Sequence, residues 1–231
     1  KGTEGNLFKA SVTYRHNTAS DIHTGSESLG LNIVNSTRIN DFMQLELGSW
    51  LNHGSGITQT YSPLSPGYSY QPYNNLMNTD GTHFTSRVEE RTSESYQSTL
   101  AQYGLYNMDI TPLDEIGLNH RKNRDLSSRT FARLAIQLTP WLRYTPQFQY
   151  EYGSYRSSQL NDKNSISVRS RVNSFASANG QGGVTYNLPY GHIYQTDDQV
   201  TQAYNFRQQL DFSRNFGELH DLVAILGSET R

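Results

Sequence analysis

The sequence predicts an all-β protein, in the form of a segment of an antiparallel transmembrane β-barrel with long extracellular loops. Three observations predict this fold class. Apolar and polar residues alternate along several segments, the connections between these segments are short and long in turn, and aromatic residues gather near both ends of the segments. Alternation with a period of two indicates strands, because successive side chains of a strand point to opposite faces of the sheet.

The composition narrows the function classes. The 231 residues carry 19 Lys and Arg against 21 Asp and Glu, and this near-neutral balance argues against a nucleic-acid-binding protein, which would present a basic face. Cysteine is absent, which excludes disulfides, thiolate metal ligands and a cysteine nucleophile. No run of about 18 apolar residues occurs, so a transmembrane helix is excluded. A content of 12% aromatic residues does not suit a disordered chain.

The clearest strand pair lies between residues 129 and 152. Residues 142–152 are apolar or aromatic on one face and polar on the other, and residues 129–138 alternate in the same way. The phase is kept across the Thr-Pro-Trp sequence at 139–141, which predicts a tight turn. Together these residues predict a β-hairpin.

Further segments complete about seven predicted strands of roughly 9–13 residues each, near the length that crosses a bilayer when tilted. The alternating patterns that mark these strands lie at 8–15, 28–33, 43–47, 204–212 and 221–228. The last of them is apolar on both faces, so the sequence leaves its phase open.

The connections between the predicted strands differ in length and decide the architecture. The short ones lie near 35–41, 139–141 and 215–219, and the long ones lie near 17–27, 54–125 and 156–201. A compact soluble domain rarely needs structureless loops of such length. A transmembrane β-barrel, in contrast, has short turns at one end and long loops outside.

Aromatic residues form two groups at opposite strand ends. The rings near the short turns are Phe8, Phe42, Trp141, Tyr144, Phe212 and Phe216, and those near the long loops are Tyr14, Trp50, Tyr150, Tyr152 and Tyr155. Such rings favour the two interfaces of a membrane. Two girdles therefore favour a membrane wall over a soluble sandwich with an aromatic core.

One predicted strand should be locally irregular, and two further features indicate that this wall is incomplete. Pro146 lies inside a predicted strand and has no N–H to donate, so we expect a bulge or a local break there. Seven strands would leave two unpaired edges in lipid, which is prohibitively costly. The chain also begins at Lys1, without an initiator Met, and stops directly after an apolar run. We expect residues 1–231 to be one partial β-barrel domain of a longer protein.

The final hairpin carries a resemblance to a known family. Phe216-Gly217 precedes His220-Asp221, an apolar run over 222–226, and Gly227-Ser228-Glu229. This order resembles a hairpin of the SusC/RagA family of TonB-dependent outer-membrane transporters. Residues 6–14 are similar to the first barrel strand after the plug domain of that family, and the order of hairpins and long loops also agrees.

The resemblance implies an architecture and a function. Members of the family are 22-stranded barrels that an N-terminal plug closes and TonB opens, and they import oligosaccharides or peptides captured by a SusD-like surface lipoprotein. By this resemblance, the chain is part of the barrel wall of an active nutrient importer in the outer membrane of a Gram-negative bacterium, and it contains no plug, TonB box or signal peptide. The implied partners are the lipoprotein, outer-membrane lipid and, through other parts of the parent protein, TonB.

The candidate contact residues are tyrosines in a long loop. Tyr61, Tyr68, Tyr70 and Tyr73 alternate with prolines, which restrict the backbone and present the rings with little loss of entropy. Aromatic faces with hydroxyl tips suit a sugar, a peptide or a partner protein. The alternative is that this loop packs on itself or on the lipoprotein.

The predicted lumen is lined by charged side chains, and no single one of them is assigned to a site. These are Lys9, Arg15, Glu46, Arg129, Arg133, Arg143, Glu151, Arg207 and Asp211. Guanidinium groups suit multidentate contacts to the plug or to ligand oxygens, and ordinary solvated lumen charges are the alternative. The basic residues at 120–124 precede a strand, where they would meet anionic lipid headgroups or balance acidic groups.

No motif predicts catalysis, a cofactor or a metal. The seven histidines have no ligand spacing, and no Gly-x-Ser-x-Gly elbow occurs. The acidic pairs at 89–90 and 197–198 leave Ca²⁺ binding in the outer loops without support, because Ca²⁺ needs about 6–8 oxygen ligands. We expect no enzyme activity and no nucleic-acid partner. The alternatives are an outer-membrane β-barrel enzyme of the protease or lipase type, a soluble all-β glycan-binding module, and a passive porin.

Overall fold

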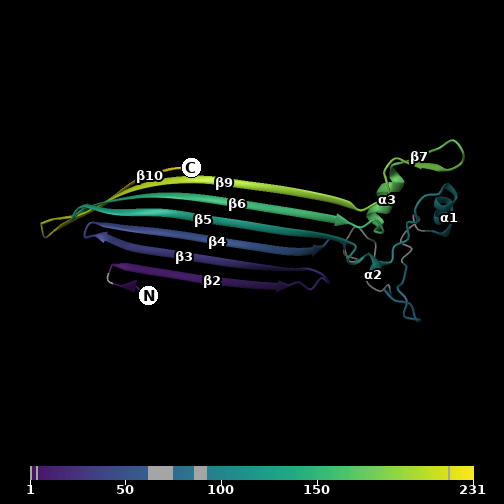
Figure 1. The fold of residues 1–231 in the computed structure, drawn as a ribbon, viewed down its shortest axis with the longest axis horizontal. Coiled ribbons are helices and arrows are strands. Elements are labelled where there is room, and N and C mark those ends of the chain that lie inside the picture. The colour runs from purple at the N-terminus through teal and green to yellow at the C-terminus, as the bar shows by residue number, and fades with distance from the viewer. Residues whose placement is uncertain (1, 4, 62–74, 86–92, 218) are drawn as a thin grey trace.

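A single curved antiparallel sheet dominates the fold (Figure 1). The computed structural model describes residues 2–3, 5–61, 75–85, 93–217 and 219–231. The strands of this sheet, in spatial order, are β1 (Gly2–Thr3), β2 (Asn6–Thr18), β3 (Gly25–Asn40), β4 (Met43–Gln59), β5 (Asn119–Thr139), β6 (Leu142–Asn161), β9 (Ile193–Phe216) and β10 (His220–Thr230). The predicted fold class is confirmed, with the seven predicted strands and one additional two-residue strand, β1. The described strands form an open sheet whose edges are β1 and β10.

Most of the strands are longer than the sequence pattern predicted. From β3 to β9 the strands of the main sheet have 16 to 24 residues, against the expected 9–13, whereas β2 has 13 and β10 has 11. The connections are correspondingly shorter, and the two longest span 60–118 and 162–192. The reason is that an alternating pattern exists only where one face is apolar. Beyond that zone the strands are mostly polar on both faces, as in the last nine residues of β6, while the backbone pairing continues.

The strand register separates an apolar face from a polar one. Paired residues of an antiparallel sheet share a face, so Leu47 of β4 lies beside Ala132 of β5, which in turn lies beside Phe148 of β6. The pairing also assigns the phase of β10. Its apolar-face residues are Leu222, Ala224 and Leu226, whereas Val223 and Ile225 share the polar face with Ser213 and Asp211.

The apolar zone has the height of a membrane. On β6 it runs over residues 142–152, which is roughly 33 Å along the strand at about 3.3 Å per residue. At the tilt of about 40° that barrel strands adopt, this length becomes roughly 25 Å, the height of the apolar band of an outer-membrane barrel.

Pro146 interrupts the sheet on one side only. The pairing of β5 with β6 skips Pro146 and Thr145 and resumes at Tyr144 in the same register. On the other side, Pro146 pairs with Gln208 of β9 without a gap. The predicted local break is therefore confirmed, because a residue without an N–H cannot complete the ladder toward β5.

The described parts of the long connections are folded, and they hold the buried core. They contain α1 (Glu94–Tyr103), α2 (Pro112–Glu115), α3 (Ile166–Ser174), and the small hairpin of β7 (Ala176–Ala178) and β8 (Val184–Tyr186), all beyond one end of the sheet (Figure 1). Among the described residues, the buried hydrophobic side chains are Tyr61, Leu100, Ile166, Val168 and Val172. A one-layer wall has no core of its own, so its faces need cover from outside.

The first prediction concerns Gly48 of β4, which lies under the ring of Phe131 on the polar face. A Cβ at Gly48 would lie 2.2 Å from the ring atom Cε1. We expect Gly48→Ala to lower the free energy of unfolding of the parent protein in detergent by about 1–3 kcal/mol, the usual effect of overpacking. Denaturant unfolding followed by tryptophan fluorescence measures this change.

Gly30→Ala is the matched control on the same face, because a Cβ at Gly30 would have its nearest neighbouring atom at 3.7 Å. The double variant Gly48→Ala/Phe131→Leu should recover most of the lost free energy of unfolding, because the smaller Leu side chain leaves room for the added Cβ. Equal stability of the Gly48→Ala and Gly30→Ala variants would contradict the packing of Phe131 on Gly48.

Candidate functional site

Charged and amide side chains on the polar face are joined into a network across the strands. The guanidinium of Arg133 on β5 donates from Nε to Gln147 of β6 at 2.9 Å and from Nη1 to Glu46 of β4 at 3.3 Å. Further along the same pair of strands, Arg129 donates to Glu151 at 2.7 Å. The nine predicted lumen residues all share this face by register. These bonds position the side chains across the wall, so the face is an ordered polar surface.

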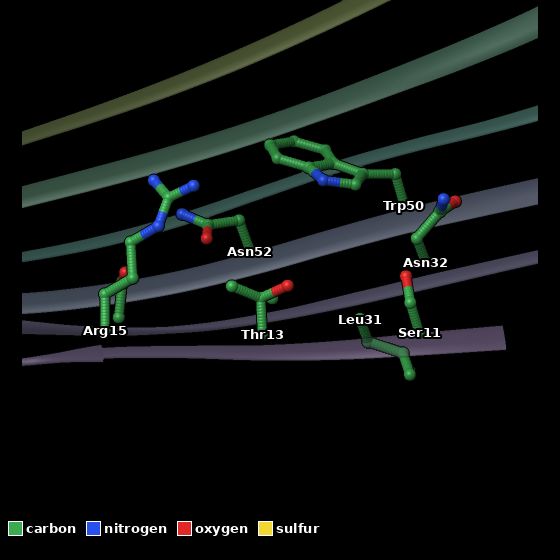
Figure 2. A pocket seen from close by; sticks show the side chains of 9 residues that line it. Ser11, Thr13, Arg15, Leu31, Asn32, Trp50 and Asn52 are labelled. Atoms are coloured by element: carbon green, nitrogen blue, oxygen red, sulfur yellow. The ribbon is translucent and has the colours of Figure 1, made fainter.

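A shallow hollow of about 150 Å³ lies on this face where β2, β3 and β4 run side by side (Figure 2). Small side chains make its floor, because Thr13 pairs with Gly30, which pairs with Asn52. In Figure 2, the indole of Trp50 and the guanidinium of Arg15 rise on either side of Asn52. The hollow therefore combines an aromatic face, a cation and amide and hydroxyl groups.

Such a surface can hold a ligand that has both apolar and hydrogen-bonding parts. An indole ring stacks on the apolar face of a sugar ring or of a peptide side chain. Amide and hydroxyl groups beside the indole can form hydrogen bonds with the polar groups of the same ligand. No cluster of three or more His, Cys, Asp or Glu suited to a metal exists in the described part of the chain. The arrangement in the hollow supports the binding of such a ligand.

The placement of Trp50 in the outer aromatic girdle is wrong. Trp50 lies in the middle of β4 and pairs with Asn32 and Arg129, on the polar face. The apolar residues of β4, from Met43 to Leu51, are odd-numbered, and an even-numbered residue must point the other way. This parity was available in the sequence and would have identified Trp50 as a residue of the polar face.

A buried carboxylate joins the two long connections. Glu115 of α2 has a side chain that is 3% exposed, and its two oxygens accept from the backbone N–H of Ile166 at 2.9 and 3.1 Å. Arg169 of α3 donates to the same carboxylate at 3.3 Å and to the carbonyl oxygens of Asn107 and Asp109. Burial raises the pKa of Glu115 above its ordinary value, although the N–H bond and the guanidinium oppose this shift.

A cluster of tyrosines lies in the same folded connections. The rings of Tyr106 and Tyr190 stack with centroids 4.3 Å apart, and Tyr186 lies 5.0 Å from Tyr106. Tyr186 donates its hydroxyl hydrogen to the carbonyl oxygen of Gly104. The cluster joins segments about 80 residues apart in the chain, and no local sequence signal distinguishes these tyrosines from the others.

The sequence predicts four other tyrosines as contact residues for a substrate or a partner. Tyr61 is buried, with 5% of its surface exposed, directly after β4. Tyr68, Tyr70 and Tyr73 lie outside the described residues. Their contact with a substrate or partner stays a prediction. Of the acidic pairs, residues 89–90 also lie outside the described residues, and Asp198 of β9 forms an ion pair with Arg156.

The comparisons with known proteins give a likeness of fold. No protein-family model matches the sequence, and no curated protein matches it. The solved structure of the RagAB peptide importer in its closed-closed state is similar in fold, with a TM-score of 0.60 over 99% of this chain at 13% sequence identity. The chain covers 23% of the length of that structure's chain. None of the helices in the described ranges is long and apolar enough to cross a membrane.

The second prediction concerns the buried carboxylate. Removing the acceptors of the Ile166 N–H leaves a buried donor unsatisfied, which costs about 1–3 kcal/mol. We expect Glu115→Ala to speed hydrogen exchange of the Ile166 amide strongly and Glu115→Gln to speed it less, because Gln keeps one acceptor oxygen. Hydrogen exchange with mass-spectrometric detection of the 162–175 peptide measures this, with Asp114→Ala, at a mostly exposed neighbour, as control.

The pH dependence of the same contact follows from the raised pKa of Glu115. The folded connections favour the protonated form, so their stability is greatest below the unfolded-state pKa and falls as the pH rises through the higher folded-state value. In the Glu115→Gln variant this dependence should disappear. Identical pH profiles of exchange in the native protein and in the Gln variant would contradict the assigned burial.

Proposed function

We propose that this chain forms part of the wall and outer vestibule of a TonB-dependent active importer in the outer membrane of a Gram-negative bacterium. The cargo is a nutrient of the oligosaccharide or peptide class, and a SusD-like surface lipoprotein captures it. One observation carries the proposal. The sheet has an apolar band of membrane height on one face and an ordered polar face on the other, and nearly the whole chain superposes on part of a peptide importer.

The open edges of the sheet support a larger barrel. The outer edge of β10 is unpaired in the described structure, and its residues Leu222, Val223, Ile225 and Leu226 are all more than half exposed. Unpaired backbone groups are prohibitively costly in hydrocarbon. Further strands of the parent protein would continue the ladder on both sides, and the lumen would then lie on the face that carries Trp50 and Arg133.

The mechanism in this proposal is binding followed by movement of the plug, without covalent chemistry in this chain. The polar face and its hollow at Trp50 would contact cargo or plug, and the folded connections would form the vestibule. Their buried core and the Glu115–Arg169 contact fix their shape in advance, which reduces the entropy lost when a lipoprotein or cargo binds. TonB would act on parts of the parent protein outside this chain.

The third prediction tests the topology by cysteine labelling, and residues 1–231 contribute no cysteine of their own to the background. In intact cells that express the full parent protein, a membrane-impermeant maleimide should label Gln181→Cys, in the β7–β8 connection. It should label Asp41→Cys, in the turn between β3 and β4, only after the outer membrane is permeabilised. Val12→Cys on the apolar face should resist labelling until detergent is added.

Labelling of Asp41→Cys in intact cells would reverse the orientation. Labelling of Val12→Cys in water would show that the apolar face is not in lipid, and the membrane wall would then be abandoned in favour of a soluble module.

The fourth prediction tests transport. Cells with the parent protein should accumulate fluorescent oligopeptides or fluorescent maltooligosaccharides, and deletion of its gene or of TonB should abolish this. We expect Trp50→Ala to reduce uptake at low concentration by roughly tenfold, the effect of losing a central aromatic contact of about 1.4 kcal/mol. Leu51→Ala is the control for the loss of side-chain volume, because Leu51 is the next residue along β4 and lies on the opposite face. Equal uptake by the two variants would remove Trp50 from the cargo path.

A further inference from the structure

Basic side chains gather just beyond the apolar band, on the same face of the sheet. We call this face, which is opposite the polar face, the outward face. Lys122 and Arg124 of β5 and Arg156 of β6 share the face of Leu126 and Tyr152 by register. Leu126, the last apolar residue of β5 in this direction, is two positions from Arg124, which is roughly 7 Å along a strand. The cations therefore lie at the level where an apolar wall leaves hydrocarbon and meets lipid headgroups.

We propose that Lys122, Arg124 and Arg156 form a binding site for the phosphate groups of lipid headgroups in the outer leaflet. This inference rests on the proposed function, because it takes the apolar face to be in lipid. It adds a specific lipid contact at one place on the wall.

The excess of positive charge at these three residues favours the binding of an anion. Arg124 and Arg156 are direct partners on neighbouring strands, and like charges in this position repel each other. Asp198 of β9 forms an ion pair with Arg156 at 3.3 Å, and both side chains are about 60% exposed. In the described part of the chain, the side chains of Lys122 and Arg124 make no ion pair or hydrogen bond. Three cations against one carboxylate leave a local charge of +2.

Other charged groups nearby do not neutralise this patch. Glu27 of β3 lies in the same row as Arg124, but β4 separates the two, and its carboxylate accepts from Ser55 at 3.2 Å and Tyr14 at 3.4 Å. His53 of β4 directs its Nδ1 atom to the backbone oxygen of Asp125 at 3.0 Å. Arg121 lies on the opposite face, where it donates to Gln159 at 2.8 Å. Lys122 and Arg124 therefore remain available on the outward face.

The chemistry and the position together favour a phosphate on a lipid. A guanidinium fork donates two parallel hydrogen bonds to phosphate oxygens, and a lysine adds a point charge. Long basic side chains at a membrane interface extend along the wall and keep their charge at headgroup level. The apolar band holds acyl chains, so a phosphate that is covalently linked to them is kept at the level of the three cations. A free phosphate has no such anchor.

The test uses the full parent protein in detergent, with diphosphoryl lipid A as probe and native mass spectrometry of the retained lipid. The test variant is Lys122→Gln/Arg124→Gln. We expect it to retain lipid A roughly tenfold to thirtyfold more weakly than the native protein, since each basic residue contributes appreciably to anionic-lipid binding. Arg121→Gln, on the other face of the same strand, is the matched control and should retain lipid A normally. The charge-conserving variant Lys122→Arg/Arg124→Lys should also retain it.

Several outcomes would overturn the site. These are unchanged retention in the double Gln variant, equal retention of dephosphorylated lipid A, and complete displacement of lipid A by millimolar inorganic phosphate, which would indicate a free-anion site. Weak retention in the Arg121→Gln variant would indicate a non-specific charge effect and would overturn it too.

The failure of this inference can be distinguished from that of the proposed function. If Val12→Cys is protected in membranes and lipid A retention is unchanged, the wall stands and the lipid site is wrong. If Val12→Cys is labelled in water, both are wrong.

Discussion

The backbone hydrogen-bond ladder of the sheet is the constraint on which the other features depend. In hydrocarbon every strand N–H and C=O needs a partner within the protein, so each strand must keep its neighbours over the full apolar band. From β2 to β6 and on to β9 and β10 the pairing does this, apart from a gap at Pro146 and register shifts near the short turns, at 38–40 and 137–139. The gap at Pro146 is tolerable because it affects one side of β6, and the register resumes unchanged at Tyr144.

A fixed register also determines which side chains lie on the apolar face and which lie on the polar face. A slip by one residue would move every apolar side chain of a strand to the other face. The network from Glu46 through Arg133 to Gln147 spans three strands and is available only in the observed register. The close approach of Phe131 to Gly48 acts in the same way, since a larger residue would block it. Polar contacts on one face thus help to keep the apolar band aligned on the other.

The sequence was sufficient for the hairpins and insufficient for everything that depends on distant contacts. Alternation located the strands because one face of the wall is apolar and the other is polar, and Pro146 indicated the break in pairing at its own position. Strand ends could not be found, because pairing continues where both faces are mostly polar, as beyond Tyr152. The contact of Glu115 with Ile166 joins residues 51 positions apart, and a carboxylate buried by tertiary packing has no signature in its local sequence.

The extension of the strands beyond the membrane band connects the wall to the folded connections as one continuous structure. β9 is 24 residues long, roughly 75 Å at about 3.3 Å per residue, so more than half of a tilted strand lies outside a band of about 25 Å. The polar face that carries Trp50 therefore continues past the apolar band to the connections that hold Glu115 and Arg169. Because each added residue pair extends a ladder whose register is already fixed in the apolar band, the position of these connections is set by the wall itself. A ligand held by those connections would be presented in line with the polar face below.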